Sequence, residues 1–149
     1  RIRYLGIPVA ADESVRKADD PIAVVTAGAA DLVVVKVQPL GGVARALSIV
    51  AAAGVPAVVS SALDTSVGLG MGVALAASLP ELSFDCGLGT ASLLAADVTD
   101  DPLVARDGRI AARRVVPSPE LLDRHAAPRE RREWWLERLR RCHAVAQER

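Results

Sequence analysis

The sequence predicts an α/β fold with parallel strands, either a (β/α) barrel or a small doubly wound sheet. Four short apolar segments recur along the chain, and they end at positions 12, 36, 60 and 84, a constant step of 24. The segments show little alternation of apolar and polar residues, which is typical of parallel strands buried on both faces. Helix-like stretches lie between them, so each repeat has the size of a minimal βα unit.

The four strands are expected at Ile7–Asp12, Leu32–Lys36, Ala57–Ser60 and Leu82–Phe84. The helices between them are expected at Pro21–Gly28, Gly42–Ala53 and Val67–Leu79. Gly54-Val55-Pro56 supports one of these boundaries, because Gly commonly follows a helix end and Pro cannot continue the helix. Periodicity alone is compatible with a barrel and with a flavodoxin-like open sheet.

The repeat stops after position 90. Residues 102–105 and 109–112 flank Arg106-Asp107-Gly108, a pattern that predicts a β-hairpin with an Asp-Gly turn. Pro117 and Pro119 mark a connector. Residues 129–147 mix Arg and Glu at short spacings and carry Trp134 and Trp135, which predicts a solvated helix with one apolar face rather than a nucleic-acid site.

Composition argues against several classes of function. The 149 residues carry 18 basic and 18 acidic side chains, so no net charge favours nucleic acid or a membrane surface. No apolar run reaches the ~18 residues that a membrane span needs. The two cysteines have no metal-binding spacing, and we expect a reduced, cytoplasmic setting. Because the sequence opens with Arg1 and not Met, we expect a processed or incomplete chain.

Asp12 and Lys36 end the first two expected strands, where side chains point into the mouth of a barrel. A carboxylate there could bind Mg²⁺, which prefers oxygen ligands, but Asp12 or Ser14 would equally suit the cap of the next helix. Lys36 lies among valines, and Lys is almost never fully buried without a partner. The chain has 16 Arg and only two Lys. We therefore favour a functional role for Lys36 over a lysine that extends to solvent from a strand end.

Ser60 and Ser61 follow the third strand at the equivalent position. Their hydroxyls and neighbouring amides could hold a substrate carboxylate, whereas no nearby His indicates a serine nucleophile. Helix capping by Ser61, Asp64 or Thr65 is the alternative. After the fourth strand come Gly87, Leu88, Gly89 and Thr90, at a place where barrels often bind anions through backbone N–H groups.

These strand ends resemble the enolase superfamily, in which a metal-binding Asp ends the fifth barrel strand and a catalytic Lys ends the sixth. IPVAADES and VVVKVQPLGG supply them as Asp12 and Lys36. The segments SSALDTSVGLG, CGLGT and APRERREWWLERLRRC resemble o-succinylbenzoate synthases of the actinobacterial type. The resemblance implies a parallel (β/α) barrel, with its C-terminal four βα units at 1–98. It also implies that the hairpin and C-terminal helix at 99–149 pack on the barrel and a capping domain.

The same resemblance implies a lyase that dehydrates 2-succinyl-6-hydroxy-2,4-cyclohexadiene-1-carboxylate to o-succinylbenzoate in menaquinone biosynthesis. Asp12 would be a ligand of Mg²⁺, with Mn²⁺ as an alternative ion. Lys36 would be an acid/base partner or a cation that stabilises the enediolate. Ser60, Ser61 and the Gly87–Thr90 loop would hold the carboxylate ends of the substrate.

Part of the superfamily pattern has no counterpart here. The Lys-x-Lys pair of strand two, two acidic metal ligands and most of the capping domain would precede residue 1. We therefore expect the isolated chain to be inactive and to need an N-terminal half, in an enzyme that is monomeric when complete. An N-acylamino acid racemase or a muconate cycloisomerase would share Asp12 and Lys36. The alternative from another class is a non-catalytic half-barrel that dimerises through open sheet edges.

Overall fold

The computed structural model of the chain describes residues 5–148. Its contacts divide the chain into two units, Arg1–Pro117 and Ser118–Arg149. Residues 99–117 are grouped with the sheet. Leu103 shows why, because its side chain is almost completely buried in the core of the first unit.

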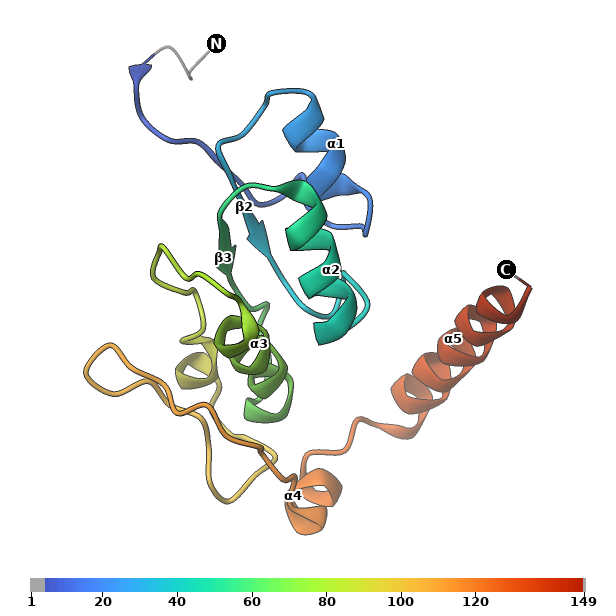
Figure 1. Cartoon of the computed structure of the whole chain (residues 1–149). Coiled ribbons are helices and arrows are strands. Elements are labelled where there is room, and N and C mark those ends of the chain that lie inside the picture. Colours follow the sequence, from blue (N-terminus) through green and yellow to red (C-terminus); the bar gives the residue numbers. More distant parts are fainter. Residues whose placement is uncertain (1–4, 149) are drawn as a thin grey trace. The chain divides into compact units, whose positions relative to one another are not determined.

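The first unit contains a parallel sheet in the order β1-β2-β3, and Figure 1 labels β2 and β3 beside the helices. Its strands are β1 (Ala10–Ala11), β2 (Leu32–Val35) and β3 (Ala57–Val59). The register places Ala10 beside Leu32, and Val34 beside Val58. A single parallel bridge between Ser60 and Gly87 adds a fourth position next to β3. An α/β fold with consecutive parallel strands is therefore confirmed.

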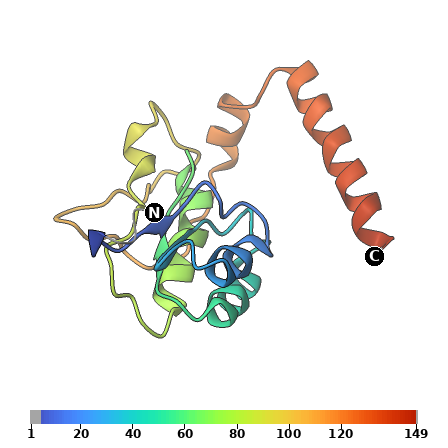
Figure 2. The same cartoon turned by 90° about the horizontal axis from the view of Figure 1, so that it is seen from above.

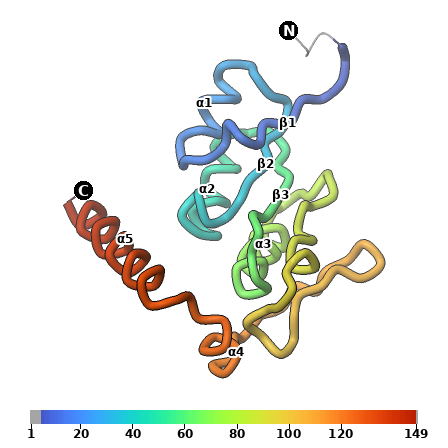
Figure 3. The backbone as a smooth tube through the Cα atoms, turned by 180° about the vertical axis from the view of Figure 1, so that it is seen from behind, coloured from blue at the N-terminus to red at the C-terminus, as the bar shows by residue number. Residues whose placement is uncertain are grey.

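Helices follow the strands as the repeat predicted. They are α1 (Asp20–Thr26), α2 (Val43–Ala53) and α3 (Ser66–Ser78), with small differences from the expected ends. Helix α2 is capped at its C-terminal end by Gly54, which adopts the left-handed conformation that favours glycine. Figures 2 and 3 show α1 beside α2, and these two helices are in contact.

The helices cover one face of the sheet. Val33, Val35 and Val59 are completely buried there and belong to one core with Ile49 of α2 and Leu69 of α3. Of the side chains that alternate with them, Val34 and Val58 each keep partial exposure, whereas Leu32 is buried. Burial of these strands on both faces is therefore partial in the described residues, and full burial stays a prediction.

The predicted strand Leu82–Phe84 is also wrong. These residues are irregular, and Leu82 and Phe84 are 46% and 42% exposed. The parallel pairing occurs instead at Gly87, where the chain comes very close to Ser60. A Cβ atom on Gly87 would lie 2.9 Å from Ser60 Oγ, so only glycine fits this approach without a shift.

The predicted Asp-Gly turn is confirmed, although the hairpin is small. Asp107 and Gly108 have φ angles of 50° and 72°, the positive values that a tight hairpin turn needs. Arg106 and Arg109 form one isolated antiparallel bridge, and the flanking residues form no further ladder.

The second unit holds α4 (Pro119–Arg124) and α5 (Arg129–Gln147), the latter with the predicted bounds. Trp134 and Trp135 pack edge to face with ring centroids 4.7 Å apart, and both are about half exposed. Among the described residues, α5 buries no side chain, which agrees with a solvated helix. In the described part of the chain, no helix has the length and apolar character needed to cross a membrane.

Candidate functional site

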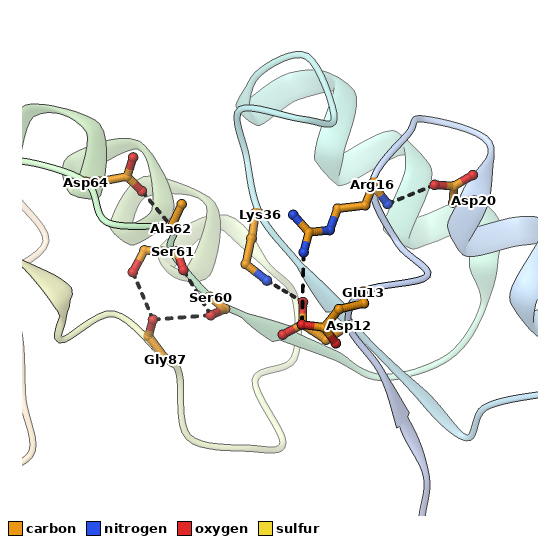
Figure 4. A network of polar contacts seen from close by, with 10 residues as sticks. All are labelled: Asp12, Glu13, Arg16, Asp20, Lys36, Ser60, Ser61, Ala62, Asp64 and Gly87. Carbon is orange, nitrogen blue, oxygen red and sulfur yellow. Dashed lines mark hydrogen bonds and ion pairs between the residues drawn. The ribbon is translucent and has the colours of Figure 1, made fainter.

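Asp12 and Lys36 meet at the carboxyl ends of adjacent parallel strands. Asp12 directly follows β1 and Lys36 directly follows β2. Lys36 Nζ forms a hydrogen-bonded ion pair with Asp12 Oδ1 (Figure 4). The Lys36 side chain is only 13% exposed and the Asp12 side chain 36%. The predicted juxtaposition is confirmed, while the roles of the two residues stay predictions.

The loop after Asp12 is organised by a second carboxylate. Asp20 Oδ2 accepts hydrogen bonds from the backbone N–H groups of Arg16 and Lys17, at 2.8 and 2.7 Å. These two bonds hold the pKa of Asp20 below its ordinary value of 3.8. Glu13 is exposed and lies 4.0 Å from the Arg16 guanidinium, so it takes no part in the pair between Asp12 and Lys36.

Ser60 and Ser61 lie at the end of β3, where Gly87 joins the ladder. Gly87 N donates to the Val59 carbonyl at 2.9 Å, and the Gly87 carbonyl accepts from Ser61 N at 3.1 Å. Ser61 Oγ also donates to that carbonyl, at 3.1 Å. The Ser60 hydroxyl makes longer contacts of 3.4 Å to the Gly87 carbonyl and 3.5 Å to the Ser61 carbonyl. Ser60 is thus the less tightly bound hydroxyl of the two.

The four residues from Gly87 to Thr90 differ in their exposure and contacts. Thr90 begins the 3₁₀ helix η2 (Thr90–Leu93), and its hydroxyl lies 2.8 Å from Ser61 Oγ. Leu88 is buried, with Cδ2 2.8 Å from where a Cβ on Gly72 of α3 would lie. Its side chain is therefore part of the core, and only its backbone could contact a substrate. Gly87 and Gly89 are exposed.

These residues do not form a metal site by themselves. Between residues 5 and 148, no group of three or more His, Cys, Asp or Glu side chains is arranged so that it could hold a metal ion. Asp12 is a single carboxylate, and Lys36 engages one of its oxygens. Since Mg²⁺ takes several oxygen ligands in octahedral geometry, Asp12 could be one ligand among others but cannot fix the ion alone.

Two polar residues near the site were missed by the sequence analysis. Gln38, two positions after Lys36, donates from Nε2 to the Gly68 carbonyl of α3 at 3.2 Å. Asp97 accepts hydrogen bonds from Ser66 at the start of α3. No local pattern could reveal the second contact, because its partners are 31 residues apart.

Comparison with known sequences places these features in a family. The enolase C-terminal domain-like family model matches residues 1–117. The o-succinylbenzoate synthase of Mycolicibacterium smegmatis is 55% identical over 139 residues, which cover 93% of this chain and 43% of that protein. The o-succinylbenzoate synthase of Mycobacterium tuberculosis strain H37Rv is 50% identical over 143 residues, which cover 96% and 44%. The chain thus spans less than half the length of these relatives.

Solved structures agree with this assignment. The muconate lactonizing enzyme from Pseudomonas putida superimposes with a TM-score of 0.71 at 25% identity, covering 80% of this chain and 36% of that one. The 2-chloromuconate cycloisomerase from Rhodococcus opacus 1CP gives a TM-score of 0.70 at 27% identity, with coverage of 85% and 36%. The α/β fold is that of the enolase superfamily, and the chain belongs to the enolase C-terminal domain-like family.

Proposed function

We propose that this chain is the C-terminal part of the barrel of an o-succinylbenzoate synthase. The observation that carries the proposal is the pair formed by Asp12 and Lys36 at adjacent strand ends. The residues of this pair are the ones that the superfamily pattern requires at those ends. Identities of 50% and 55% to o-succinylbenzoate synthases favour this activity over others in the superfamily.

The proposed partial barrel explains the uneven burial of the sheet. Val34 and Val58 lie on the face away from the helices and keep partial exposure. In a closed barrel this face is the interior, which side chains from all the strands fill in layers. We infer that the remaining strands pair along the outer edge of β1 and along the segment at Gly87. Residues 99–149 would then pack on the barrel and the capping domain.

Lys36 is the proposed catalytic residue. The reaction removes a proton from the carbon next to a carboxylate, and hydroxide leaves the neighbouring carbon. The Nζ of Lys36 would exchange that proton or stabilise the negative charge that develops on the carboxylate. Asp12 accepts a hydrogen bond from Nζ and so orients the amine. Ser60, Ser61 and the backbone of residues 87–90 would bind the carboxylate ends of the substrate.

Mg²⁺ is the proposed metal, with Asp12 as one of its ligands and the others outside this chain. When bound, the ion would supply further stabilisation for the charge that develops on the substrate carboxylate. Asp12 alone does not make a metal site among the described residues.

The decisive experiment is a dehydration assay with and without a complementing half. The purified chain is assayed alone and after co-expression with the part of the M. smegmatis relative that has no counterpart here. We expect no turnover from the chain alone and measurable product from the pair. Robust turnover from the chain alone would contradict the residue assignments, and product from muconate only would favour a cycloisomerase.

Variants of the two lysines test the role of Lys36 in the complemented enzyme. Lys36→Ala and Lys36→Arg should both lose about 10² to 10⁴-fold in turnover, since Arg is longer, planar and effectively never deprotonated. Lys17, which is exposed, is the matched control, and Lys17→Arg should be unchanged. Near-normal turnover of Lys36→Arg would contradict the catalytic role and would mean that Lys36 contributes only its positive charge.

A further inference from the structure

The first turn of α3 is held by a carboxylate from a distant part of the chain. Asp97 Oδ2 accepts a hydrogen bond from Ser66 Oγ at 2.5 Å and from Ser66 N at 3.1 Å. Asp97 Oδ1 lies 3.2 Å from the same backbone N and accepts from Val98 N at 2.7 Å. Both carboxylate oxygens of Asp97 are thus engaged by this turn and by its own loop.

The Ser66 hydroxyl joins two segments at once. It donates to Asp97 and accepts from Leu103 N at 2.8 Å. Ser66 is completely buried and Leu103 is 2% exposed, so water cannot replace either bond without local opening. We call Asp97, Ser66 and Leu103 the α3 clamp.

The α3 clamp supplies the N-terminal capping that the residues next to α3 do not provide. Thr65 is the N-cap of α3, yet its side chain makes no capping hydrogen bond. The first N–H groups of a helix have no partner within it, and a negative charge is favourable at that end. The Asp97 carboxylate meets both needs from outside the helix.

The position of Ser66 connects the clamp to the candidate site. Ser66 directly follows residues 60–65, the loop that begins with Ser60 and Ser61. Within that loop, Asp64 Oδ2 accepts from Ala62 N at 3.2 Å. One end of the loop is fixed by the sheet through Gly87, and the other is fixed by the clamp.

We propose that Asp97 is a positioning residue that fixes the 60–65 loop through Ser66 and so sets the placement of the Ser60 and Ser61 hydroxyls for the substrate carboxylate. The link to substrate rests on the proposed function, whereas the effect on the loop does not. Asp97 touches no substrate in this proposal. Its loss should weaken substrate binding more than it slows the chemical step at Lys36.

The first test is amide hydrogen exchange on the full 149-residue chain. In Asp97→Ala, the amides of residues 61–66 and of Leu103 should exchange about tenfold faster or more, because charge-assisted bonds to buried groups are lost. The amides of α2 should be unchanged. Asp97→Asn keeps an oxygen acceptor and should fall between wild type and Asp97→Ala. Asp100→Ala, which removes an exposed carboxylate of the same loop, is the matched control and should have no effect.

The second test is kinetic, in the complemented enzyme. Asp97→Ala should raise KM about tenfold while kcat falls less than about threefold, and Asp97→Asn should recover part of the loss. Unchanged amide hydrogen exchange at residues 61–66 would overturn the α3 clamp. If Asp97→Ala proves too unstable to measure, Asp97→Asn tests the same amides. Faster exchange with an unchanged KM would overturn its role in positioning. If wild type gives no o-succinylbenzoate, the proposed function fails, and the exchange pattern still decides whether Asp97 fixes the loop.

Discussion

Removing either partner of the ion pair between Asp12 and Lys36 should have unequal effects on stability. Asp12→Asn leaves the Lys36 ammonium without a countercharge, in a side chain that is only 13% exposed. Lys36→Met leaves the Asp12 carboxylate, which at 36% exposure can still be hydrated. Met also keeps most of the apolar stem of Lys beside the buried strand β2. We therefore expect Asp12→Asn to be the more damaging change.

The burial of the two side chains sets the magnitude. Breaking a fully buried pair costs about 3 to 5 kcal/mol and breaking an exposed pair about 0 to 1 kcal/mol. Lys36 lies between these limits and nearer the buried one, so Asp12→Asn should lower the free energy of unfolding by about 2 kcal/mol. Lys36→Met should lower it by about 1 kcal/mol or less, because the remaining carboxylate stays partly in water.

Urea denaturation of the 149-residue chain measures both changes, provided that the m-value is the same for all variants. Lys17→Met, at an exposed lysine, is the control and should shift the free energy of unfolding by less than about 0.5 kcal/mol. Equal losses for the two variants, or a larger loss for Lys36→Met, would refute the reasoning from burial. In the complemented enzyme, Lys36→Met should lose turnover although it is the more stable of the two variants, because it removes the proposed catalytic amine.

Three further predictions concern other parts of the first unit. Ser61→Ala should lower the free energy of unfolding, measured by urea denaturation, by about 1 to 2 kcal/mol, because it leaves the Thr90 hydroxyl without its partner. The double variant Ser61→Ala/Thr90→Val should lose less than the sum of the losses of the two single variants, because neither hydroxyl remains unpaired. The pKa of Asp20 should be found below 3.8 by NMR titration. Because the pKa of Asp20 is lower in the folded chain than in the unfolded chain, ionised Asp20 stabilises the fold fully at pH values above its unfolded pKa. This contribution is lost as the pH falls through the folded pKa. Asp20→Asn should remove this pH dependence of the free energy of unfolding. Gly72→Ala should lower stability by about 1 kcal/mol, because crowding of Leu88 outweighs the better helix propensity of Ala, and a stability gain would contradict this.

The order of elements could be predicted because local patterns encode it. Apolar runs and helix-forming stretches predicted α1, α2, α3 and α5 close to their observed bounds, because the pattern of apolar and polar residues within each helix is local to that helix. The fourth strand position could not be predicted in the same way. Leu82 and Phe84 have the side chains of a strand but lie exposed, whereas the pairing occurs at Gly87, where a Cβ atom would crowd the Ser60 hydroxyl. The position of this pairing depends on the space left beside Ser60 in the folded chain, and an apolar sequence pattern carries no information about that space.

The candidate site shows the same division between local and distant causes. Asp12 and Lys36 could be predicted as neighbours because equal positions in a βα repeat fall at the same edge of a parallel sheet, and their ion pair follows from opposite charge. The contact between Asp97 and Ser66 joins residues 31 positions apart and follows no repeat. Such contacts depend on how an irregular loop returns to a helix, so only the folded structure reveals them. The residues that would do the chemistry are therefore more visible in this sequence than the residue that would hold their loop in place.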